Sequence, residues 1–270
     1  MTTATTALPT TEHSATANRR VAIVTGASSG IGRAIAHTLV GDGYHVVAVA
    51  RRADRLNALA GELAASDGRY RNERTGSLTP LPADVTAKGA GAMIVARTLE
   101  AHGRLDALVN AAGYGLNMPS EQMADSDWDQ LFTVNINAVA HLTTAALPAL
   151  LESAATRQIA DVVTIASTAG LAAEPGAAAY SASKFAARGL MEAWRKEFSS
   201  RDIRFTTINP GAVATEFGGD QQFIQDWYAD MHQRGAVALP EDVAQTVSLA
   251  LALSSRASLA EVTLRPTRQP

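Results

Sequence analysis

From Val21 onward, short apolar runs alternate with amphipathic stretches along the chain. This alternation is typical of parallel strands joined by helices, so that one sheet is covered by helices on both faces. We therefore predict a single α/β domain with a doubly wound parallel sheet of about seven strands. The predicted strands are residues 21–25, 44–50, 78–83, 105–109, 162–167, 204–208 and 261–264, and the predicted helices are residues 31–40, 56–63, 128–151, 180–198 and one that begins at Pro240.

Two prolines interrupt the third of these strands. Pro80 and Pro82 lie within residues 78–83, and proline cannot donate a backbone hydrogen bond to a neighbouring strand. Such a strand belongs at the edge of a sheet, which is where the doubly wound order 3-2-1-4-5-6 places its third strand. The prolines therefore support the predicted order.

Composition narrows the possible functions. A chain of 270 residues that is 47% hydrophobic and 18% charged can bury one large core. The net charge of −3 and the scattered arginines argue against a nucleic-acid partner. The chain has no cysteine, which excludes disulfides and thiolate metal sites, and its histidines have no metal-ligand spacing. We therefore expect no metal.

The N-terminal residues have a composition of their own. Residues 1–18 are rich in Thr and Ala and contain no apolar run of the kind found in a signal peptide. No segment of the chain approaches about 18 uninterrupted apolar residues, so we expect no membrane partner. We predict a cytoplasmic protein with a disordered leader at 1–18 and one folded domain over 19–270.

Three glycines follow the first predicted strand. Gly26, Gly30 and Gly32 stand where the chain passes from strand to helix, and such a turn lets the backbone approach a pyrophosphate at the helix N-terminus. A structural turn is the alternative interpretation of the glycines alone. Their position between a strand and a helix favours a dinucleotide site.

The end of the second predicted strand indicates which dinucleotide binds. An acidic residue there would bind the adenosine ribose of NAD, whereas this chain has Ala50, Arg51 and Arg52. A carboxylate repels a 2′-phosphate and a guanidinium pairs with it, so the pattern favours NADP(H). Two solvated arginines are the alternative, but the missing acid is informative in either case.

A tyrosine and a lysine four residues apart begin a later helix. Tyr180 and Lys184 lie on one face of that helix, so the ammonium can stabilise the phenolate and lower a pKa that is about 10 when unperturbed. The pair alone would occur by chance in about one in twenty such chains. The order of a glycine loop, then Ser167 at the end of an apolar strand, then this pair distinguishes it from a core tyrosine beside a solvated lysine.

The motifs that carry a family resemblance are Thr25-Gly-Ala-Ser-Ser-Gly-Ile-Gly32, Asp84-Val85, Asn110-Ala-Ala-Gly113, Asn135, Ser167, Tyr180-x-x-x-Lys184 and Asn209-Pro-Gly211 with Thr215. Together they resemble the classical short-chain dehydrogenase/reductase family over about residues 20–264. The chain departs from the usual pattern at Ala111 and Ala166, where Asn and Ser are common, and keeps the neighbouring functional positions. Its last residues, 261–269, resemble a bacterial subgroup that includes clavulanic acid dehydrogenase.

The resemblance implies an NADP-binding Rossmann domain over 19–270, a homodimer or homotetramer, and a catalytic tetrad of Asn135, Ser167, Tyr180 and Lys184. In this family's chemistry the tyrosine exchanges a proton with the substrate oxygen and the serine stabilises the oxyanion. The lysine would also bind the nicotinamide ribose, and the asparagine would help hold a water in a proton relay. The expected cofactor contacts are Gly26, Ser28, Ser29, Gly30, Ile31, Gly32, Arg51, Arg52, Asp84, Val85, Asn110, Ala111, Gly113, Tyr180, Lys184, Pro210, Gly211, Val213 and Thr215.

The expected activity is hydride transfer between NADP(H) and a small-molecule ketone, aldehyde or secondary alcohol. Substrate choice should come from residues 216–236, whose aromatic residues suit a lid that closes over a ligand, although ordinary packing of a short helix is the alternative. A catalytically quiet NADP-binding sensor or scaffold, and a dehydratase or epimerase on the same fold, are the alternative functions. The expected substrate contacts are Tyr114, Leu171, Glu174, Phe217 and Trp227.

Overall fold

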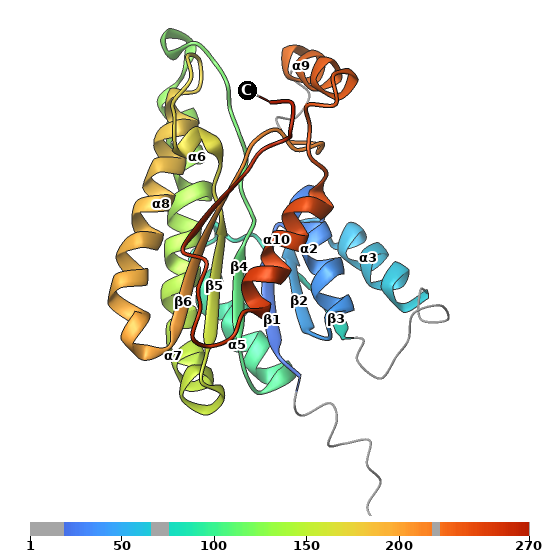
Figure 1. Cartoon of the computed structure of the whole chain (residues 1–270), viewed down its shortest axis with the longest axis vertical. Helices are drawn as coiled ribbons and strands as arrows, with labels where there is room; N and C mark the ends of the chain where they lie inside the picture. Colours follow the sequence, from blue (N-terminus) through green and yellow to red (C-terminus); the bar gives the residue numbers. More distant parts are fainter. Residues whose placement is uncertain (1–18, 66–75, 218–221, 270) are drawn as a thin grey trace, which may run out of the picture.

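A computed structural model describes residues 19–65, 76–217 and 222–269, which form a three-layer α/β domain (Figure 1). Within these residues the central sheet has the order β3-β2-β1-β4-β5-β6-β7, and every neighbouring pair is parallel. This confirms the predicted doubly wound order and adds β7 beyond β6. The strands are β1 (Val21–Thr25), β2 (His45–Ala50), β3 (Ser77–Pro82), β4 (Ala107–Asn110), β5 (Ala160–Ile165), β6 (Ile203–Pro210) and β7 (Glu261–Leu264).

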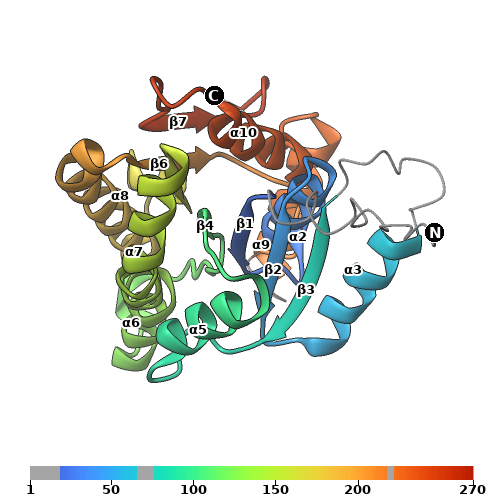
Figure 2. The same ribbon diagram turned by 90° about the horizontal axis from the view of Figure 1, so that it is seen from below.

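Two hydrophobic cores lie on the two faces of the sheet. Successive side chains of a strand point to opposite faces, so an uninterrupted apolar run serves both cores. In β1, Ala22 and Val24 belong to one core and Ile23 to the other. The first core includes α2 (Gly30–Gly41), α3 (Ala53–Ala65) and α10 (Pro240–Ala252), and the second includes α5 (Ala90–His102), α7 (Ala138–Arg157) and α8 (Ala178–Phe198) (Figure 2).

The strand with the two prolines is the edge strand, as predicted. Pro80 and Pro82 of β3 stand opposite Ala48 and Ala50 of β2, and β3 is the first strand of the sheet order. Only β1 and β7 have their predicted bounds, and the bounds of the other strands shift by one or two residues. The predicted strand 105–109 forms at Ala107–Asn110, and the predicted strand 162–167 forms at Ala160–Ile165, so Ser167 lies beyond its strand.

The helix predicted at 128–151 is longer and changes its winding. It consists of α6 (Asp125–Phe132), the π-helical turn η2 (Thr133–Asn137) and α7. A π turn adds a residue to one turn of helix, and such turns often occur at functional sites. The whole run Asp125–Arg157 is long and apolar enough to cross a membrane by length and composition, but α7 supplies part of the second core.

Helix α5 was missed in the sequence because its first turn contains small residues that weaken the apolar periodicity. A Cβ on Gly91 would lie 3.0 Å from both the His141 carbonyl oxygen and the Leu142 Cα, so α5 approaches α7 too closely for a larger residue. Tertiary packing therefore explains the composition here. The remaining short elements are η1 (Ser120–Gln122), η3 (Thr168–Gly170), η4 (Ser199–Arg201) and α9 (Gln222–Gln233).

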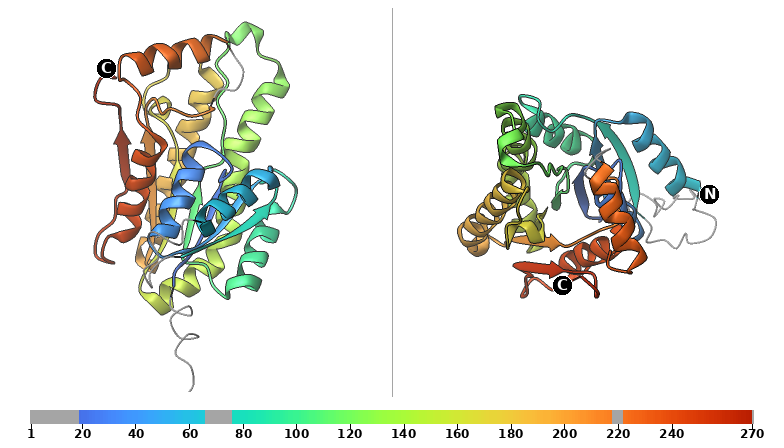
Figure 3. Two further views of the ribbon diagram at one scale, coloured as in Figure 1. Left: turned by 90° about the vertical axis from the view of Figure 1, so that its right-hand side faces the viewer. Right: turned by 90° about the horizontal axis from the view of Figure 1, so that it is seen from above.

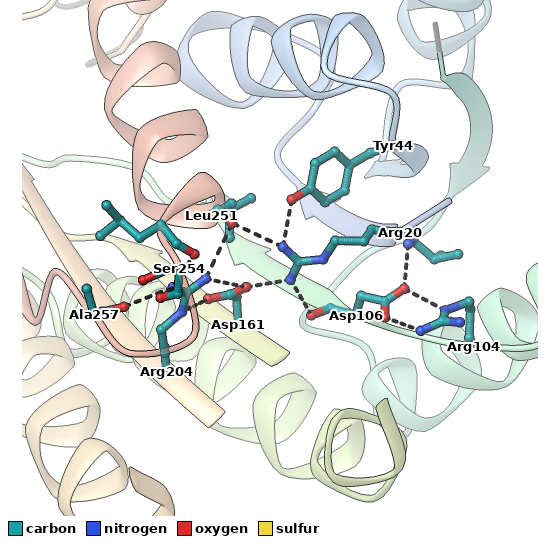
Figure 4. A network of polar contacts seen from close by, with 11 residues as sticks. Arg20, Tyr44, Arg104, Asp106, Asp161, Arg204, Leu251, Ser254 and Ala257 are labelled. Atoms are coloured by element: carbon teal, nitrogen blue, oxygen red, sulfur yellow. Dashed lines mark hydrogen bonds and ion pairs between the residues drawn. The ribbon is translucent and has the colours of Figure 1, made fainter. Parts of the chain in front are cut away.

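Ion pairs join the amino ends of the strands (Figure 4). Asp161 at the start of β5 accepts hydrogen bonds from Arg20, which precedes β1, and from Arg204 of β6. Arg20 also donates to the Tyr44 hydroxyl. We call Arg20, Asp161 and Arg204 the amino-edge network, and it leaves the opposite edge of the sheet for a binding site. Arg204 is 7% exposed and also donates to backbone carbonyls at the end of α10 and just beyond it, those of Leu251, Leu253, Ser254 and Ala257.

Candidate active site

A cleft of about 1160 Å³ runs along the carboxyl ends of the strands. Residues that follow β1, β2, β4, β5 and β6 line it, and it crosses the point between β1 and β4 where the strand order reverses. Open α/β sheets bind their ligands at this position. Helix α9 and the C-terminus lie above the same edge of the sheet (Figures 1 and 3).

The glycine loop forms one end of the cleft. Gly26 and Gly30 have positive φ angles of 69° and 49°, and a Cβ on Gly32 would lie 2.4 Å from the Gly26 carbonyl oxygen. The turn therefore requires glycine at these positions. Ser29 begins α2 without a side-chain hydrogen bond to its first turn, so the backbone amides there are available to an anion. This cradle fits a pyrophosphate.

Two arginines follow β2 beside this loop, and both line the cleft. Arg52 is held against the glycine loop, since its guanidinium donates to Ser28 Oγ at 3.1 Å and to Ser29 Oγ at 2.8 Å. Arg51 is exposed and faces Asp84. The backbone and side chain of Thr86 donate hydrogen bonds that lower the pKa of the Asp84 carboxyl, and the Arg51 charge lowers it further.

Tyr180, Lys184 and Ser167 meet at the other end of the cleft. Lys184 is 5% exposed, its Nζ donates to the Ile165 carbonyl at 3.1 Å, and it lies 5.7 Å from the centre of the Tyr180 ring. Burial lowers the pKa of Lys184 to about 8. Ser167 follows β5, and its Oγ accepts a hydrogen bond from the Ala169 backbone.

Close packing places Ser167 beside α8. A Cβ on Gly170, which ends η3, would lie 2.8 Å from the Lys184 carbonyl oxygen. Only glycine allows the turn after Ser167 to approach the helix this closely. The sequence-predicted serine, tyrosine and lysine are therefore brought together by this contact as well as by the sheet.

Asn135 lies behind the cleft and is 3% exposed. Its Oδ1 accepts from the Tyr114 backbone at 3.1 Å, and its Nδ2 donates to the Tyr114 carbonyl at 3.0 Å and to Ser183 Oγ at 3.1 Å. The π turn thus fixes both the loop after β4 and the residue before Lys184. The water that the resemblance assigns to Asn135 stays a prediction.

Two expected contacts do not line the cleft. Asn110 is buried at the end of β4, and its amide donates to the hydroxyls of Thr143 and Thr164. It therefore ties β4 to α7 and β5. Leu171 is also absent from the lining residues. Residues 218–221, within the expected lid, and the side chain of Trp227 lie outside the described part of the structure.

Tyr114, Glu174 and Phe217, three of the expected substrate contacts, line the same cleft as Tyr180. The Phe217 and Tyr180 rings are 5.8 Å apart between centroids. A Cβ on Gly115 would lie 2.6 Å from Phe217 Cε1, so this ring packs onto the glycine. Residues 216–217 therefore reach across the mouth of the cleft to the catalytic end.

Several lining residues were missed in the sequence. Gln269 lies next to the last residue, and its Oε1 accepts a hydrogen bond from the Ala212 backbone at 3.1 Å. Glu216 accepts a hydrogen bond from Arg55 at 2.8 Å and lies 3.8 Å from Arg52. No local pattern marks these residues, because their partners are distant in sequence. Others are Asn117, Gln130, Thr133 and Val134.

The described residues contain no group of three or more His, Asp or Glu side chains that could hold a metal ion.

Comparisons with known proteins identify the family that this chain resembles in sequence. The family model described as short chain dehydrogenase matches residues 20–223. An uncharacterized oxidoreductase of Mycobacterium tuberculosis is 38% identical over 259 residues, which cover 93% of this chain and 92% of that protein.

Two solved structures have a similar fold. An alcohol dehydrogenase from the archaeon Thermococcus sibiricus, complexed with 5-hydroxy-NADP, has a TM-score of 0.79 and 28% identity, covering 94% of this chain and 99% of that one. A metagenomic short-chain oxidoreductase in complex with NADP has a TM-score of 0.74 and 32% identity, covering 92% of this chain and 97% of that one.

Proposed function

The chain belongs to the short-chain dehydrogenase family, and on that premise we propose that it is an NADP(H)-dependent oxidoreductase. It interconverts a small-molecule ketone or aldehyde and the corresponding alcohol. The observation that carries the proposal is the meeting of Tyr180, Lys184 and Ser167 in a cleft that also contains a glycine-lined helix N-terminus. A proton-exchanging phenol and a cradle for a phosphate-bearing cofactor are what such a reaction requires.

Each part of the cleft has a role toward the cofactor. The backbone amides at the start of α2 bind the pyrophosphate, and Asp84 and Val85 hold the adenine. The segment from Pro210 to Thr215 holds the nicotinamide end. When bound, the nicotinamide supplies hydride to the substrate carbon or accepts hydride from it.

Tyr180 is the proton donor in the reducing direction. Its hydroxyl gives a proton to the substrate oxygen, while the Ser167 hydroxyl stabilises the negative charge that develops there. The Lys184 ammonium lies 5.7 Å from the tyrosine ring centre, so its charge favours the phenolate that remains. The hydrogen bond from Lys184 to Ile165 keeps the ammonium in this position.

The preference for NADP(H) is supported by charge. Arg51 and Arg52 follow β2 where an NAD enzyme would carry an acid. Arg52 is already directed at the serines of the glycine loop, next to which a 2′-phosphate would lie. The relatives whose structures contain NADP or 5-hydroxy-NADP are consistent with this choice.

We make three further proposals, which concern the substrate lid, the oligomeric state and the location of the protein. Residues 216–236, which include α9, act as the substrate lid of a single domain over 19–270. The protein is a homodimer or homotetramer, which is supported by the exposed Trp128 of α6 and Phe185 of α8 at 37% and 43% exposure. A cytoplasmic location rests on composition alone. The similarity to the clavulanic acid dehydrogenase subgroup stays a prediction.

A single substitution tests the proposed function. Tyr180→Phe should reduce kcat by about 100-fold or more on the best substrate, because general acid–base catalysis contributes about 10²–10⁴-fold. Its affinity for NADPH should change little. The assay is a panel of ketones and aldehydes, followed by the loss of NADPH absorbance. Tyr44→Phe is the matched control, since Tyr44 contacts the amino-edge network and does not line the cleft.

The outcomes separate the candidate functions. A Tyr180→Phe variant that keeps more than about a tenth of wild-type kcat would contradict the assignment of the acid. A wild-type protein that binds NADPH, reduces no carbonyl and oxidises no alcohol would favour a sensor or scaffold.

A further inference from the structure

The two ends of the cleft differ in the charged side chains that line them. We call the part lined by Tyr114, Gln130, Ser167, Glu174, Tyr180 and Phe217 the substrate end. The opposite part, beside the glycine loop, is lined by Arg51 and Arg52, together with the carboxylates of Asp84 and Glu216. At the substrate end Glu174 is exposed to solvent within the cleft wall.

Lys184, the cation nearest the substrate end among the cleft-lining residues, already has a hydrogen-bond acceptor and lies beside Tyr180. Lys184 is 5% exposed and donates to the Ile165 carbonyl, beside Tyr180. Because so little of this side chain is exposed, a substrate carboxylate or phosphate has poor access to it. Such a ligand would also remove the ammonium from the phenol that it serves. Lys184 therefore does not act as an anchor for an anionic substrate.

The segments that frame the substrate end are acidic in sequence. Residues 105–156, 158–183 and 205–233 contain neither lysine nor arginine. Among the described acidic residues of these segments, Glu174 lines the substrate end and the charge of Asp127 acts on the Tyr114 hydroxyl, whereas Asp106 and Asp161 lie at the opposite edge of the sheet and pair with arginines.

A second acidic residue, Asp127, lies near the wall of the substrate end. Burial raises the pKa of the Tyr114 hydroxyl, and the charge of Asp127 raises it further. Tyr114 lies at the substrate end, and its backbone is held by Asn135. Asp127 therefore adds a negative charge near the loop after β4, apart from Glu174 in the loop after β5.

We propose that the substrate end selects carbonyl or alcohol substrates that are neutral or carry an ammonium group, and that Glu174 is the residue that meets the ammonium. Substrates with a carboxylate or phosphate are disfavoured. The proposal rests on the proposed function, since it concerns the substrate of the same cleft. Glu174 is solvent-exposed, so attraction and repulsion are each modest, and together they should separate cationic from anionic isosteres by about tenfold.

Three aryl ketones of one skeleton test this selectivity. They are 4-(aminomethyl)acetophenone, 4-(hydroxymethyl)acetophenone and 4-acetylbenzoate, which are cationic, neutral and anionic at neutral pH. Each is measured with the full chain and NADPH, as a substrate and as an inhibitor of the best carbonyl of the panel. We expect the ammonium ketone to exceed the carboxylate by at least about tenfold in kcat/KM or in inhibitory affinity. High salt should reduce this ratio.

A substitution assigns the effect to Glu174. Glu174→Gln should lower the ratio of ammonium to neutral ketone by about threefold. Glu121→Gln, which removes the same charge from a residue outside the cleft lining, should change the ratio less. Equal or better use of the carboxylate by the wild type would overturn the proposal, as would an unchanged ratio in Glu174→Gln.

The charge selectivity can also be tested if the protein has no oxidoreductase activity. A protein that reduces none of the carbonyls can still be titrated with the three ketones in its NADPH complex, followed by cofactor fluorescence. The ranking of their affinities then tests the charge selectivity without turnover. Tighter binding of the ammonium ketone would support it, and tighter or equal binding of the carboxylate would contradict it.

Discussion

Lys184 holds a charge in a place that water barely reaches. It is 5% exposed, and burial lowers its pKa to about 8 from a usual value of 10.5. A charge is costly to bury unless it is paired, and Lys184 has a hydrogen bond to the Ile165 carbonyl. Burying the Lys184 ammonium therefore lowers the free energy of unfolding, and the folded protein gains a cation beside Tyr180. Active sites commonly contain residues that reduce stability in this way.

The lowered pKa of Lys184 predicts that the free energy of unfolding depends on pH. The folded chain loses the Lys184 proton near pH 8 and the unfolded chain near pH 10.5, so between these values the unfolded state binds more protons and stability rises with pH. The penalty is fully present below about pH 8. The Lys184→Met variant has no ammonium and so no such penalty. The free energy of unfolding of the wild type minus that of Lys184→Met should therefore rise by on the order of 2 kcal/mol from pH 7.5 to 10.5. Calorimetry at several pH values measures the difference, and a flat one would contradict the shifted pKa.

Arg52 is the second residue whose role depends on its surroundings. Because it is held by Ser28 and Ser29, it is pre-positioned for a phosphate beside the glycine loop. Arg52→Ala should weaken NADPH binding by about tenfold, the size of one charge-assisted hydrogen bond, and leave NADH binding nearly unchanged. Arg51→Ala should also erode the preference.

Fluorescence titration with NADPH and NADH measures both affinities. The control is Arg97→Ala, which removes a cation paired with Glu100 on α5, outside the cleft lining. Wild-type protein that bound NADH as tightly as NADPH would refute the cofactor assignment.

The segment after β6 connects several elements. Thr215 lies against Gly30 at the start of α2, Glu216 pairs with Arg55 of α3, and Phe217 packs onto Gly115 after β4. Consecutive residues thus touch the phosphate end and the catalytic end of the cleft. A change at one end can therefore be transmitted to the other through very few residues.

Glu216 tests how firmly this segment is held. It lies 3.8 Å from Arg52, and the two side chains are 65% and 43% exposed. Exposed pairs contribute about 0–1 kcal/mol, so Glu216→Gln should leave the melting temperature nearly unchanged. It should tighten NADPH about threefold, because a carboxylate no longer competes with the 2′-phosphate for Arg52, and should leave NADH unchanged.

Glu62→Gln is the matched control for this substitution. Glu62 is on the same helix as Arg55, but it pairs with Arg33. Equal tightening of NADPH in both variants would indicate a general charge effect and would contradict a specific contact of Glu216.

At the scale of the whole molecule, the carboxyl ends and the amino ends of the strands have different roles. The cleft occupies the carboxyl ends of the strands, and the amino-edge network closes the other ends. Asp161 and Arg204 are 2% and 7% exposed. Removing one partner of a buried pair leaves an uncompensated charge, which is far more costly than removing an exposed one.

Asp161→Asn should therefore lower the free energy of unfolding by about 3 kcal/mol or more. Because the network lies at the edge of the sheet away from the cleft, NADPH affinity of the folded variant should stay close to that of the wild type. Urea unfolding and NADPH titration measure the two quantities. Glu100→Gln, which breaks the exposed pair with Arg97, should cost less than about 1 kcal/mol. Equal losses in the two variants would refute a structural role for the network.

The sequence alone determined the features that are encoded locally. Apolar runs predicted β1 and β7 at their observed bounds, and Pro80 and Pro82 placed β3 at the edge. The glycine loop, Ser167 and the Tyr180–Lys184 pair were all found, and they lie in one cleft. These features could be predicted because strand periodicity, turn chemistry and the four-residue spacing on a helix are properties of neighbouring residues.

Tertiary structure alone decided the rest. Asn110 has a motif that resembles a cofactor contact, yet its amide is directed at Thr143 and Thr164. Gln269, near the end of the sequence, lines the cleft, and Glu216 accepts a hydrogen bond from Arg55 of α3. The direction of a side chain and its choice of partner depend on how distant elements pack, and that information is not carried by any short stretch of sequence.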